Sequence, residues 1–338
     1  MKTTIHDIAE RANCSITTVS QVLNGKGQRF SSELQKKIVT LAKDLNYRPN
    51  HVAVSLVTKR TRTVGLVLPN VHNMYFALLA EEIEKCCRQL NLDLVLCNSL
   101  DDPRMEENYI DTLIGRNVDG IIVALAINTT IEQCLKNMQK VADDRIAFCL
   151  IDRLLPSKEL DMVTINHELG GYLATRHLLD LGHRRLAFLT GPEKLLDAQL
   201  RLKGACKAIS ECPSCEVPFI FTGDYSWEKG YEMAEQIVKS KPSAIFAFND
   251  WSAFGLIIKL KEMGLRIPED LSIVGYDDIP LLNGGVLSLT TIHQPIDQLA
   301  EEALNTLLFR FENQDAAAVQ RVIDPSIRIR KSTRNLMN

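Results

Sequence analysis

The chain has 338 residues, of which 46% are hydrophobic and 24% are charged, and its net charge is −3. This length allows two or three domains with cores of their own, and no stretch reaches the roughly 18 uninterrupted apolar residues that a membrane span requires. The first residues, MKTTIHDIAERANCS, lack the apolar core of a signal peptide, so we expect a cytoplasmic protein.

The charge is divided unevenly along the chain. Residues 1–62 carry eleven Lys and Arg against four Asp and Glu, a net charge of +7. The rest carries 28 basic and 38 acidic residues, a net charge of −10. A basic head on an acidic body indicates that the head alone binds a polyanion.

The first sixty residues predict three short helices. Thr4 and Asp7 have the spacing of a capping box, and Ser15 is placed to cap a second helix that stops at Asn24-Gly25-Lys26-Gly27. A third helix begins at Ser31 or Ser32 and turns these apolar residues inward: Leu34, Ile38, Leu41, Ala42 and Leu45. Such helices form either a structural bundle or a helix-turn-helix, whose second helix enters the major groove, and the charge of +7 favours DNA binding.

The segments TIHDIAERANCSITTVSQVLNG and NYRPNHVAVSL resemble the head of the lactose/galactose repressor (LacI/GalR) family of bacterial transcription regulators. The resemblance implies a palindromic operator bound by a dimer, with Ile16, Thr17 and Gln21 touching base edges. Glutamine can bond adenine through both amide atoms, and the apolar groups of Ile16 and Thr17 can pack on a thymine methyl. The other DNA-binding candidates in the head are Thr4, Ser15, Thr18, Ser20 and Asn24. The hydroxyls of Ser15, Thr18 and Ser20 are expected to contact phosphate or to cap helices.

A hinge follows the head at residues 49–62. Asn50 can cap a short helix, HVAVSLV, which by the resemblance forms on DNA and pairs with its dimer mate in the minor groove. Leu56 takes the position of a wedge between two base pairs. The family commonly has Arg at the position of Val54, which leaves one minor-groove or backbone contact open. Lys59, Arg60 and Arg62 either neutralise phosphates, which we favour, or form a solvated linker.

From Thr63 onward, short β-rich runs alternate with longer helical ones. The first series is TVGLVL, DLVLCNS, DGIIVAL and IAFCLID, with helices near 76–90, 104–116 and 130–142. A second series begins with VTIN and continues through RLAFLTG, FIFTGDY, AIFAFND and LSIVGYDD. Strands that are apolar on both faces and separated by helices predict parallel sheets covered on both sides. We therefore predict an α/β fold: a helix-turn-helix head, a hinge helix, and a core of two doubly wound lobes with a cleft between them.

The core resembles periplasmic sugar-binding proteins and the regulatory core of the same family, most closely at LTTIHQP, LGHRRLAFLTGP and IVGYDD. The resemblance implies that the chain crosses between the lobes near 163–166, 291–295 and 322–327. The predicted domains are 1–48 for the head, 49–62 for the hinge and linker, 63–163 with 295–323 for the first lobe, and 164–294 with 324–338 for the second.

Open α/β sheets bind ligands at the carboxyl ends of their strands. The resemblance and the strand ends together give these effector-binding candidates: Asn73, Tyr75, Phe76, Asp152, Arg153, Arg201, Tyr225, Asn249, Asp250, Asp277 and Gln294. Carboxylates, amides and a guanidinium between aromatic faces suit a polyol, so a free pentose or hexose is the expected effector. Arg153 and Lys194 leave room for a sugar phosphate, and a nucleobase is the third alternative. The candidates also have structural interpretations: Asp250 as a helix cap, Arg153 as the partner of an acidic neighbour, and Phe76 or Tyr225 as core.

Other classes of protein are disfavoured. The sequence has no GxxxxGK, no GxSxG and no GxGxxG after a strand, so no enzyme is expected. We interpret the nine cysteines as free thiols. The Cys212/Cys215 pair has the spacing of a zinc site but lacks the two further ligands that zinc needs, and the seven histidines are not spaced as metal ligands. We therefore expect neither a metal nor a cofactor. A transport-type sugar-binding protein would be secreted and would lack the basic head.

The resemblance implies an allosteric repressor. The ligand changes the angle between the lobes, and the hinge helices then pair differently over the minor groove. The sequence does not determine whether the ligand acts as an inducer or as a corepressor. The tail IRIRKSTRNLMN lacks leucine heptads, so a homodimer is expected.

Overall fold

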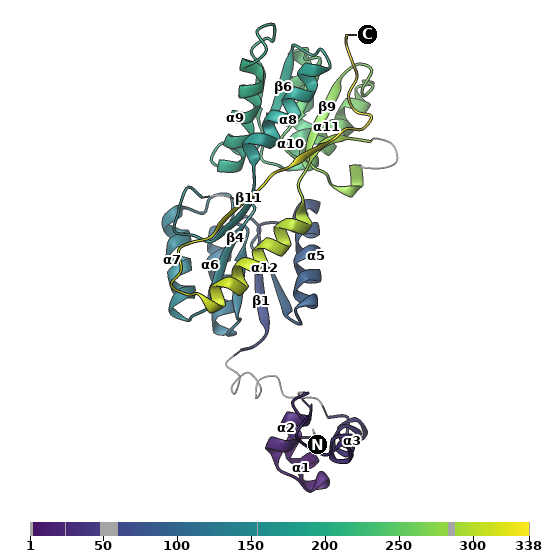
Figure 1. The fold of residues 1–338 in the computed structure, drawn as a ribbon. Coiled ribbons are helices and arrows are strands. Elements are labelled where there is room, and N and C mark those ends of the chain that lie inside the picture. Colours follow the sequence, from purple (N-terminus) through teal and green to yellow (C-terminus); the bar gives the residue numbers. More distant parts are fainter. Residues whose placement is uncertain (1–2, 24, 48–59, 154, 283–287, 338) are drawn as a thin grey trace. The chain divides into compact units, whose positions relative to one another are not determined.

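The computed structural model describes residues 3–23, 25–47, 60–153, 155–282 and 288–337. The chain divides into two compact units, Met1–Thr61 and Arg62–Asn338 (Figure 1). The predicted hinge helix and the candidates Asn24, Asn50, Val54 and Leu56 lie outside the described residues. Among the residues that are described, no helix is both long enough and apolar enough to cross a bilayer.

The described residues of the first unit form three helices, as the sequence predicts: α1 (Ile5–Ala12), α2 (Ile16–Leu23) and α3 (Ser32–Asp44). The Asp7 carboxylate accepts the Thr4 backbone N–H at 2.7 Å, and the Ser15 hydroxyl accepts the Thr18 N–H at 3.1 Å. The Ser31 hydroxyl accepts a backbone N–H of α3, so Ser31 is the cap of this helix. One side chain from each helix is fully buried at the centre of the unit: Ile8, Val19 and Ile38.

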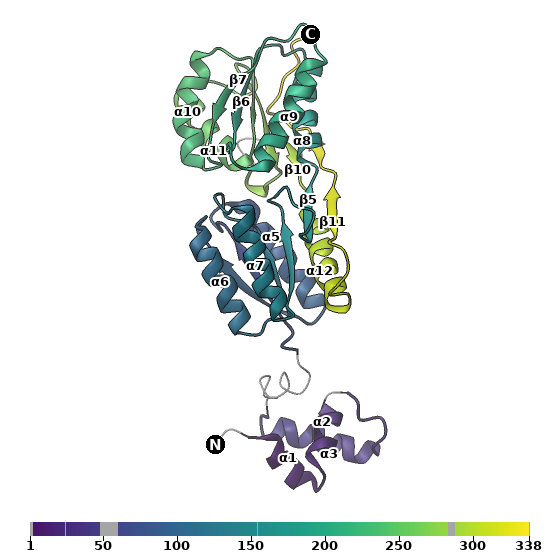
Figure 2. The ribbon, with the colours of Figure 1, turned by 90° about the vertical axis from the view of Figure 1, so that its left-hand side faces the viewer.

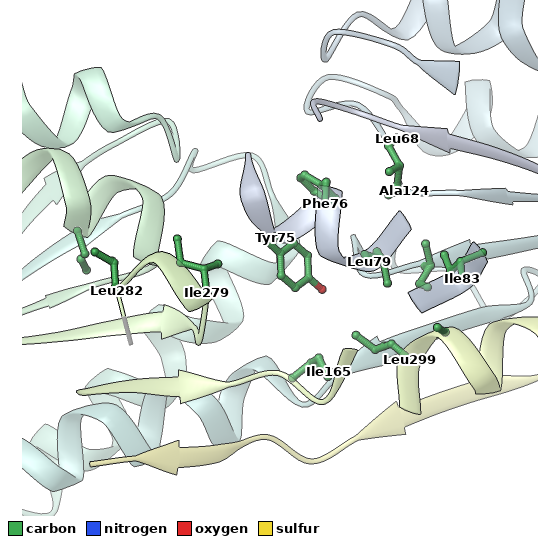
Figure 3. Close-up of a cluster of buried hydrophobic side chains, with 14 of the residues drawn as sticks. Leu68, Tyr75, Phe76, Leu79, Ile83, Ala124, Ile165, Ile279, Leu282 and Leu299 are labelled. Atoms are coloured by element: carbon green, nitrogen blue, oxygen red, sulfur yellow. The ribbon is translucent and has the colours of Figure 1, made fainter. Parts of the chain in front are cut away.

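The first lobe of the core is a six-stranded parallel sheet in the order β11-β5-β4-β3-β1-β2. Its strands are β1 (Thr63–Leu68), β2 (Asp93–Asn98), β3 (Gly120–Val123), β4 (Ala147–Ile151), β5 (Met162–Ile165) and β11 (Gln320–Ile323). Its helices are α5 (Met74–Gln89), α6 (Pro103–Gly115), α7 (Ile131–Asp143) and α12 (Ile296–Glu312). Helices α5 and α12 cover one face, where Leu79 and Leu299 belong to the same buried cluster (Figure 3), and α6 and α7 cover the other. Helices on both faces explain why the inner strands β1, β3, β4 and β5 are buried almost throughout, whereas the edge strands β2 and β11 are more exposed.

The second lobe is a six-stranded sheet in the order β12-β10-β9-β8-β6-β7. Its strands are β6 (Leu186–Thr190), β7 (Phe219–Thr222), β8 (Ala244–Ala247), β9 (Ser272–Asp277), β10 (Thr290–His293) and β12 (Ser326–Arg328). Its helices are α8 (His167–Asp180), α9 (Leu196–Ser210), α10 (Trp227–Lys239), α11 (Asp250–Glu262) and the short 3₁₀ helix η1 (Pro280–Leu282). The sheet is parallel except for β12, which pairs antiparallel with β10 at the edge.

The assignment of VTIN to the second series of strands is wrong. These residues belong to β5, which lies between β4 and β11 in the first sheet. The first sheet therefore continues to Ile165, two residues past the predicted boundary at 163. The chain then passes between the lobes from β5 to α8, from β10 to α12 and from β11 to β12 (Figure 2). The apolar character of a segment such as VTIN shows that it forms a buried strand, but it does not show which of two similar sheets the strand joins.

Candidate functional site

A small inner cavity lies between the two lobes, where the carboxyl ends of strands from both sheets meet. Its volume is about 20 Å³. The residues that line it are Asn73, Tyr75, Phe76, Asp152, Arg153, Asp197, Arg201, Tyr225, Asn249, Asp277 and Gln294. Ten of these are effector-binding candidates from the sequence, and Asp197 is the addition. The crevice at the carboxyl ends of strands is where open α/β sheets hold ligands.

The first lobe contributes side chains from the start of α5 and the end of β4. Asn73 is the N-cap of α5, and its Oδ1 accepts the backbone N–H of Tyr75 at 3.1 Å. This cap begins the helix so that Tyr75 and Phe76, in its first turn, reach the cavity. The Tyr75 hydroxyl donates to Oδ1 of Asp152 at 2.7 Å, which ties α5 to the end of β4.

Three lining residues have a strained backbone. The φ angles of Asp152, Tyr225 and Asp277 are 66°, 68° and 122°. Side-chain-bearing residues seldom adopt positive φ, and such residues concentrate at functional sites because the surrounding packing must hold them there. Each of the three ends a strand or follows one closely, so the strain coincides with the place where the chain turns into the cavity.

Arg201 is the buried cation of the second lobe. Its guanidinium lies over the ring of Tyr276, 3.8 Å from the ring centroid, and donates to the carbonyl oxygen of Phe248. Helices α8 and α9 cross closely enough that a Cβ placed on Gly171 would lie 1.9 Å from the Arg201 carbonyl oxygen. The absence of a side chain at Gly171 thus determines how near α9, and with it Arg201, lies to α8.

Asp197 lies one turn before Arg201 on α9 and is 4% exposed. Its Oδ2 accepts the Tyr225 hydroxyl at 2.9 Å and lies 3.9 Å from the Arg201 guanidinium. Its Oδ1 is buried and has no hydrogen-bond partner among the described residues. A buried carboxylate oxygen in this condition costs free energy, so it is suited to accept a hydrogen bond from a ligand.

Three carboxyl groups surround the single guanidinium of Arg201. Burial raises the pKa of Asp152 to about 6, and it also raises the pKa of Asp277 well above its ordinary value. Burial is also the largest single influence on Asp197, but the nearby Arg201, His167 and Arg153 and the hydrogen bond from Tyr225 together outweigh it and lower the pKa of Asp197. The other arginine, Arg153, pairs with Asp101 at 2.5 Å, as one interpretation of the sequence anticipates. The cavity is therefore rich in hydrogen-bond acceptors and poor in available positive charge.

Asp250, unlike the other ten effector-binding candidates, lines neither of the two cavities. Its carboxylate accepts the hydroxyl of Thr291 at 2.7 Å and the backbone N–H of Ile279 at 3.0 Å. It is not the cap of α11 either, because Asn249 fills that role by accepting the backbone N–H of Ser252 at 3.0 Å. The Asp250 carboxylate is thus used to hold β10 and the segment after β9 together.

A larger outer cavity of about 360 Å³ adjoins the inner one. It is lined by Asn70, His72, Asn73, Phe76, Asp101, Arg153, Asp224, Tyr225, Ser226, Trp227, Glu228 and Trp251. The two cavities share four of these residues: Asn73, Phe76, Arg153 and Tyr225. The sequence predicts neither Trp227 nor Trp251 as a site residue.

In the head, the predicted base-reading residues lie on α2. Ile16 is 39% exposed although it is apolar, and Thr17 is exposed beside it. Gln21 is half-buried, and its Oε1 accepts a hydrogen bond from Arg29. An exposed isoleucine at the first residue of the second helix is consistent with a surface that packs against bases.

The predicted hydroxyl contacts of the head have partners within it. The hydroxyls of Ser15 and Thr18 lie 2.8 Å apart, and the Thr4 hydroxyl donates to the Asp7 carboxylate at 2.9 Å. Ser20 also has an interaction within the chain. The capping role expected for Ser15 is therefore present, and a hydroxyl oxygen that accepts one bond can still donate to a phosphate.

Comparison with known proteins identifies the family. Residues 4–50 match the profile of bacterial regulatory proteins of the lacI family, and residues 175–333 match that of periplasmic binding protein-like domains. The chain is 34% identical over 335 residues to the HTH-type transcriptional regulator DegA of Bacillus subtilis (strain 168), and the match covers 98% of each chain. The chain belongs to the LacI family of bacterial transcription regulators. It is a DNA-binding regulator with a periplasmic-binding-protein-like core, not an enzyme.

Further relatives agree over the same length. A repressor named PurR from Photobacterium profundum is 34% identical over 98% of this chain and 99% of its own. Among solved structures, the lac repressor dimer bound to operator and the anti-inducer ONPF has a TM-score of 0.87, with 26% identity over 99% of this chain and 100% of that one. A LacI family regulator from Enterococcus faecalis V583 with bound ribose has a TM-score of 0.72 and 31% identity, over 81% of this chain and 99% of that one.

The sequence of this LacI-family core contains local patterns that could have indicated the cavity residues Asp197, Trp227 and Trp251. Asp197 lies four residues before Arg201, so both side chains share one face of a helix. Trp227 and Trp251 lie at helix starts shortly after strand ends, as do several residues that the sequence does predict. The sequence does not show how close these helix starts lie to one another in space.

Proposed function

We propose that this chain is a transcriptional repressor that binds a palindromic operator as a homodimer and responds to a sugar held in the inner cavity. The choice of a sugar as the ligand rests on one observation. Carboxyl, amide and guanidinium groups from both lobes converge on the inner cavity together with the rings of Phe76 and Tyr225. A sugar offers many hydroxyl donors, and the oxygens of three carboxyl groups can accept hydrogen bonds from them, so these groups suit it well. The E. faecalis relative that holds ribose supports the same class of ligand.

A sugar phosphate is less suitable than a neutral sugar. Arg153 and Arg201 are the only arginine or lysine residues that line the inner cavity in the described part of the chain, and Lys194 lines neither cavity. Arg153 already pairs with Asp101, while Arg201 lies among Asp197 and the other two carboxyl groups. A phosphate would add negative charge without a free cation to receive it, and this arrangement is costly in a buried site.

A nucleobase is the second candidate, and one observation favours it. Four Phe, Tyr and Trp rings line the outer cavity: Phe76, Tyr225, Trp227 and Trp251. Aromatic side chains stack on the face of a base. A base carries few donors, however, and would leave the carboxylates of the inner cavity largely unmatched.

Ligand entry into the inner cavity requires movement. A cavity of about 20 Å³ holds about one water molecule. A sugar ring enters only if side chains or lobes separate, which breaks contacts such as the 2.7 Å hydrogen bond from Gln294 to Asp277. The ligand therefore favours a different lobe arrangement, and the hinge transmits this difference to the head.

On the DNA side, we propose that Ile16, Thr17 and Gln21 read base edges from α2. The contacts of Asn50, Val54 and Leu56 follow from the family resemblance alone. Exposure of Ile16 and Thr17 at the start of α2 supports the first part of this proposal.

The proposal is tested by measuring thermal stability of the full chain against free sugars, sugar phosphates and nucleobases. A ligand at ~100 times its Kd should add roughly 2.7 kcal/mol to the free energy of unfolding. Compounds that shift the transition are then titrated by calorimetry and added to a DNA-binding assay with a palindrome selected from random sequence. A response to sugars alone supports the proposal. A response confined to phosphates or bases, or none at all, contradicts it.

A further inference from the structure

We infer that the effector is larger than one sugar ring: the inner cavity takes one ring, and the outer cavity takes a second, so that the effector is an uncharged disaccharide or longer glycoside. This inference rests on the proposed function. The two cavities differ greatly in volume: the inner cavity measures about 20 Å³ and the adjoining outer cavity about 360 Å³. Pockets that enclose small ligands begin near roughly 300 Å³.

The two cavities form one path. Asn73 and Phe76 of the first lobe line both, as does Tyr225 of the second. A molecule anchored by Arg201 and the inner carboxylates therefore has its next atoms directed past Phe76 and Tyr225 into the outer space. A single ring in the inner cavity would leave that space to solvent.

Two tryptophans supply flat surfaces in the outer cavity. Trp227 is the first residue of α10 and Trp251 the second residue of α11. These helices touch, because a Cβ on Gly255 would lie 1.8 Å from the Trp227 carbonyl oxygen. Both helix starts are thereby held at the same cavity.

Each indole is also supported from behind. Trp251 stacks on Phe254 with ring centroids 5.7 Å apart and planes 17° from parallel, and Trp227 meets Tyr231 edge-on at 6.4 Å. Both tryptophans are only half-buried, so they are not ordinary core residues. Rigid aromatic rings that keep an open face toward a cavity can bind the apolar C–H face of a sugar ring with little loss of conformational entropy.

The polar groups of the outer cavity favour hydroxyl donors over an anion. Asp101, Asp224 and Glu228 line it together with Arg153. The charge of Arg153 is already matched by Asp101, and Asp224 accepts the backbone N–H of Ser226 at 2.9 Å. Acceptor oxygens beside aromatic faces suit several sugar hydroxyls, whereas a nucleobase presents few donors and a phosphate would meet like charge.

The chain contains its own reporter for this site. It has two tryptophans, and both line the outer cavity. Intrinsic tryptophan fluorescence therefore reports on the surroundings of this cavity, while calorimetry measures total binding. We would titrate the full chain with matched probes: glucose with maltose and cellobiose, galactose with lactose, xylose with xylobiose, fructose with sucrose, and adenine and guanine as bases.

We expect one disaccharide to bind at least about tenfold more tightly than either of its component sugars and to shift the tryptophan emission, because its second ring gains contact with an aromatic face. Trp227→Ala and Trp251→Ala should each reduce disaccharide affinity toward that of the single sugar and leave monosaccharide affinity unchanged. Trp227→Phe and Trp251→Phe retain a ring and serve if an alanine variant fails to fold. Phe309→Ala, which removes a 42% exposed ring outside both cavities, is the control and should change nothing.

Each other outcome has one meaning. A monosaccharide that binds as tightly as every disaccharide containing it, with equal affinity in the tryptophan variants, overturns this inference and leaves the proposed function intact. Binding of a base that is lost in the tryptophan variants overturns the inference and supports the second candidate. No calorimetric signal from any sugar contradicts the proposed function, and the inference fails with it.

Discussion

Gln294 donates a 2.7 Å hydrogen bond to Oδ1 of Asp277, and its own Oε1 lies 3.4 Å from the Tyr75 hydroxyl. Gln294 directly follows β10, where the chain leaves the second sheet for α12 of the first lobe. One side chain at a crossing point therefore contacts both lobes. A ligand that separates these groups must change how the lobes are held together.

Asp277→Asn tests the role of this carboxyl group. The substitution keeps the shape and one acceptor oxygen but replaces the other carboxyl oxygen by an amide nitrogen, which only donates. A buried donor that loses its partner costs about 1–3 kcal/mol, so sugar affinity should fall by roughly 10- to 100-fold. Calorimetry with the sugar identified in the panel measures this change. Operator affinity without sugar should be unchanged, and wild-type sugar affinity in the variant would show that Asp277 does not touch the ligand.

Leu56→Ala should have the opposite pattern. If Leu56 is inserted between base pairs, its loss removes the bend and the contacts that the bend allows, and operator affinity should fall by at least roughly tenfold. Sugar affinity should stay at the wild-type value because the cavities lie in the core. A fluorescence-anisotropy titration with the selected palindrome gives the first quantity. Val217→Ala, at a side chain that is 86% exposed, is the matched control; equal operator affinity in the Leu56 variant would remove the wedge assignment.

Gly171→Ala should disturb the site through the α8–α9 contact. The added methyl would lie 1.9 Å from the Arg201 carbonyl oxygen, so the helices must separate. Overpacking of this kind costs about 1–3 kcal/mol or more, which denaturant unfolding would detect, and displacement of Arg201 should weaken sugar binding as well. Gly115→Ala is the control, because that glycine ends α6 and a Cβ there meets no atom within 4 Å. Equal stability of the two variants would contradict the contact.

Glu106→Gln should change how the stability of the chain depends on pH. Glu106 is fully buried, accepts the Ala126 N–H at 2.6 Å and the Thr129 hydroxyl at 3.1 Å, and has a pKa that burial raises to about 7. The folded state therefore holds this proton more tightly than the unfolded chain. The resulting stabilisation is complete below pH 4.5 and is lost as the pH rises through about 7.

Glutamine has the same shape and stays neutral, so it should not show this loss. The free energy of unfolding of the variant, relative to wild type, should rise between about pH 4.5 and 8, by something on the order of 3 kcal/mol. Urea unfolding at several pH values gives both curves. Parallel curves would mean that folding does not raise the pKa of Glu106.

The sequence alone determined the features that depend on neighbouring residues. Helix starts at Thr4, Ser15 and Ser31 follow from side chains that accept backbone N–H groups three residues away in the chain. Apolar runs identified the strands, and their carboxyl ends together with the family resemblance identified ten residues that meet in one cavity. The separation of a basic head from an acidic core is also a property of composition along the chain.

The tertiary structure decided what depends on distant partners. Asp250 and Asp197 are both acidic residues in the first turn of a helix, but their surroundings differ. The carboxylate of Asp250 is bonded by Thr291 and Ile279 and does not line the inner cavity. Asp197 lines that cavity, and its Oδ1 has no hydrogen-bond partner among the described residues. VTIN joins the first sheet because β4 and β11 flank it. Trp227 and Trp251 come to one cavity through the contact of α10 with α11. A side chain's direction depends on the groups packed around it, and those groups lie tens of residues away in the chain.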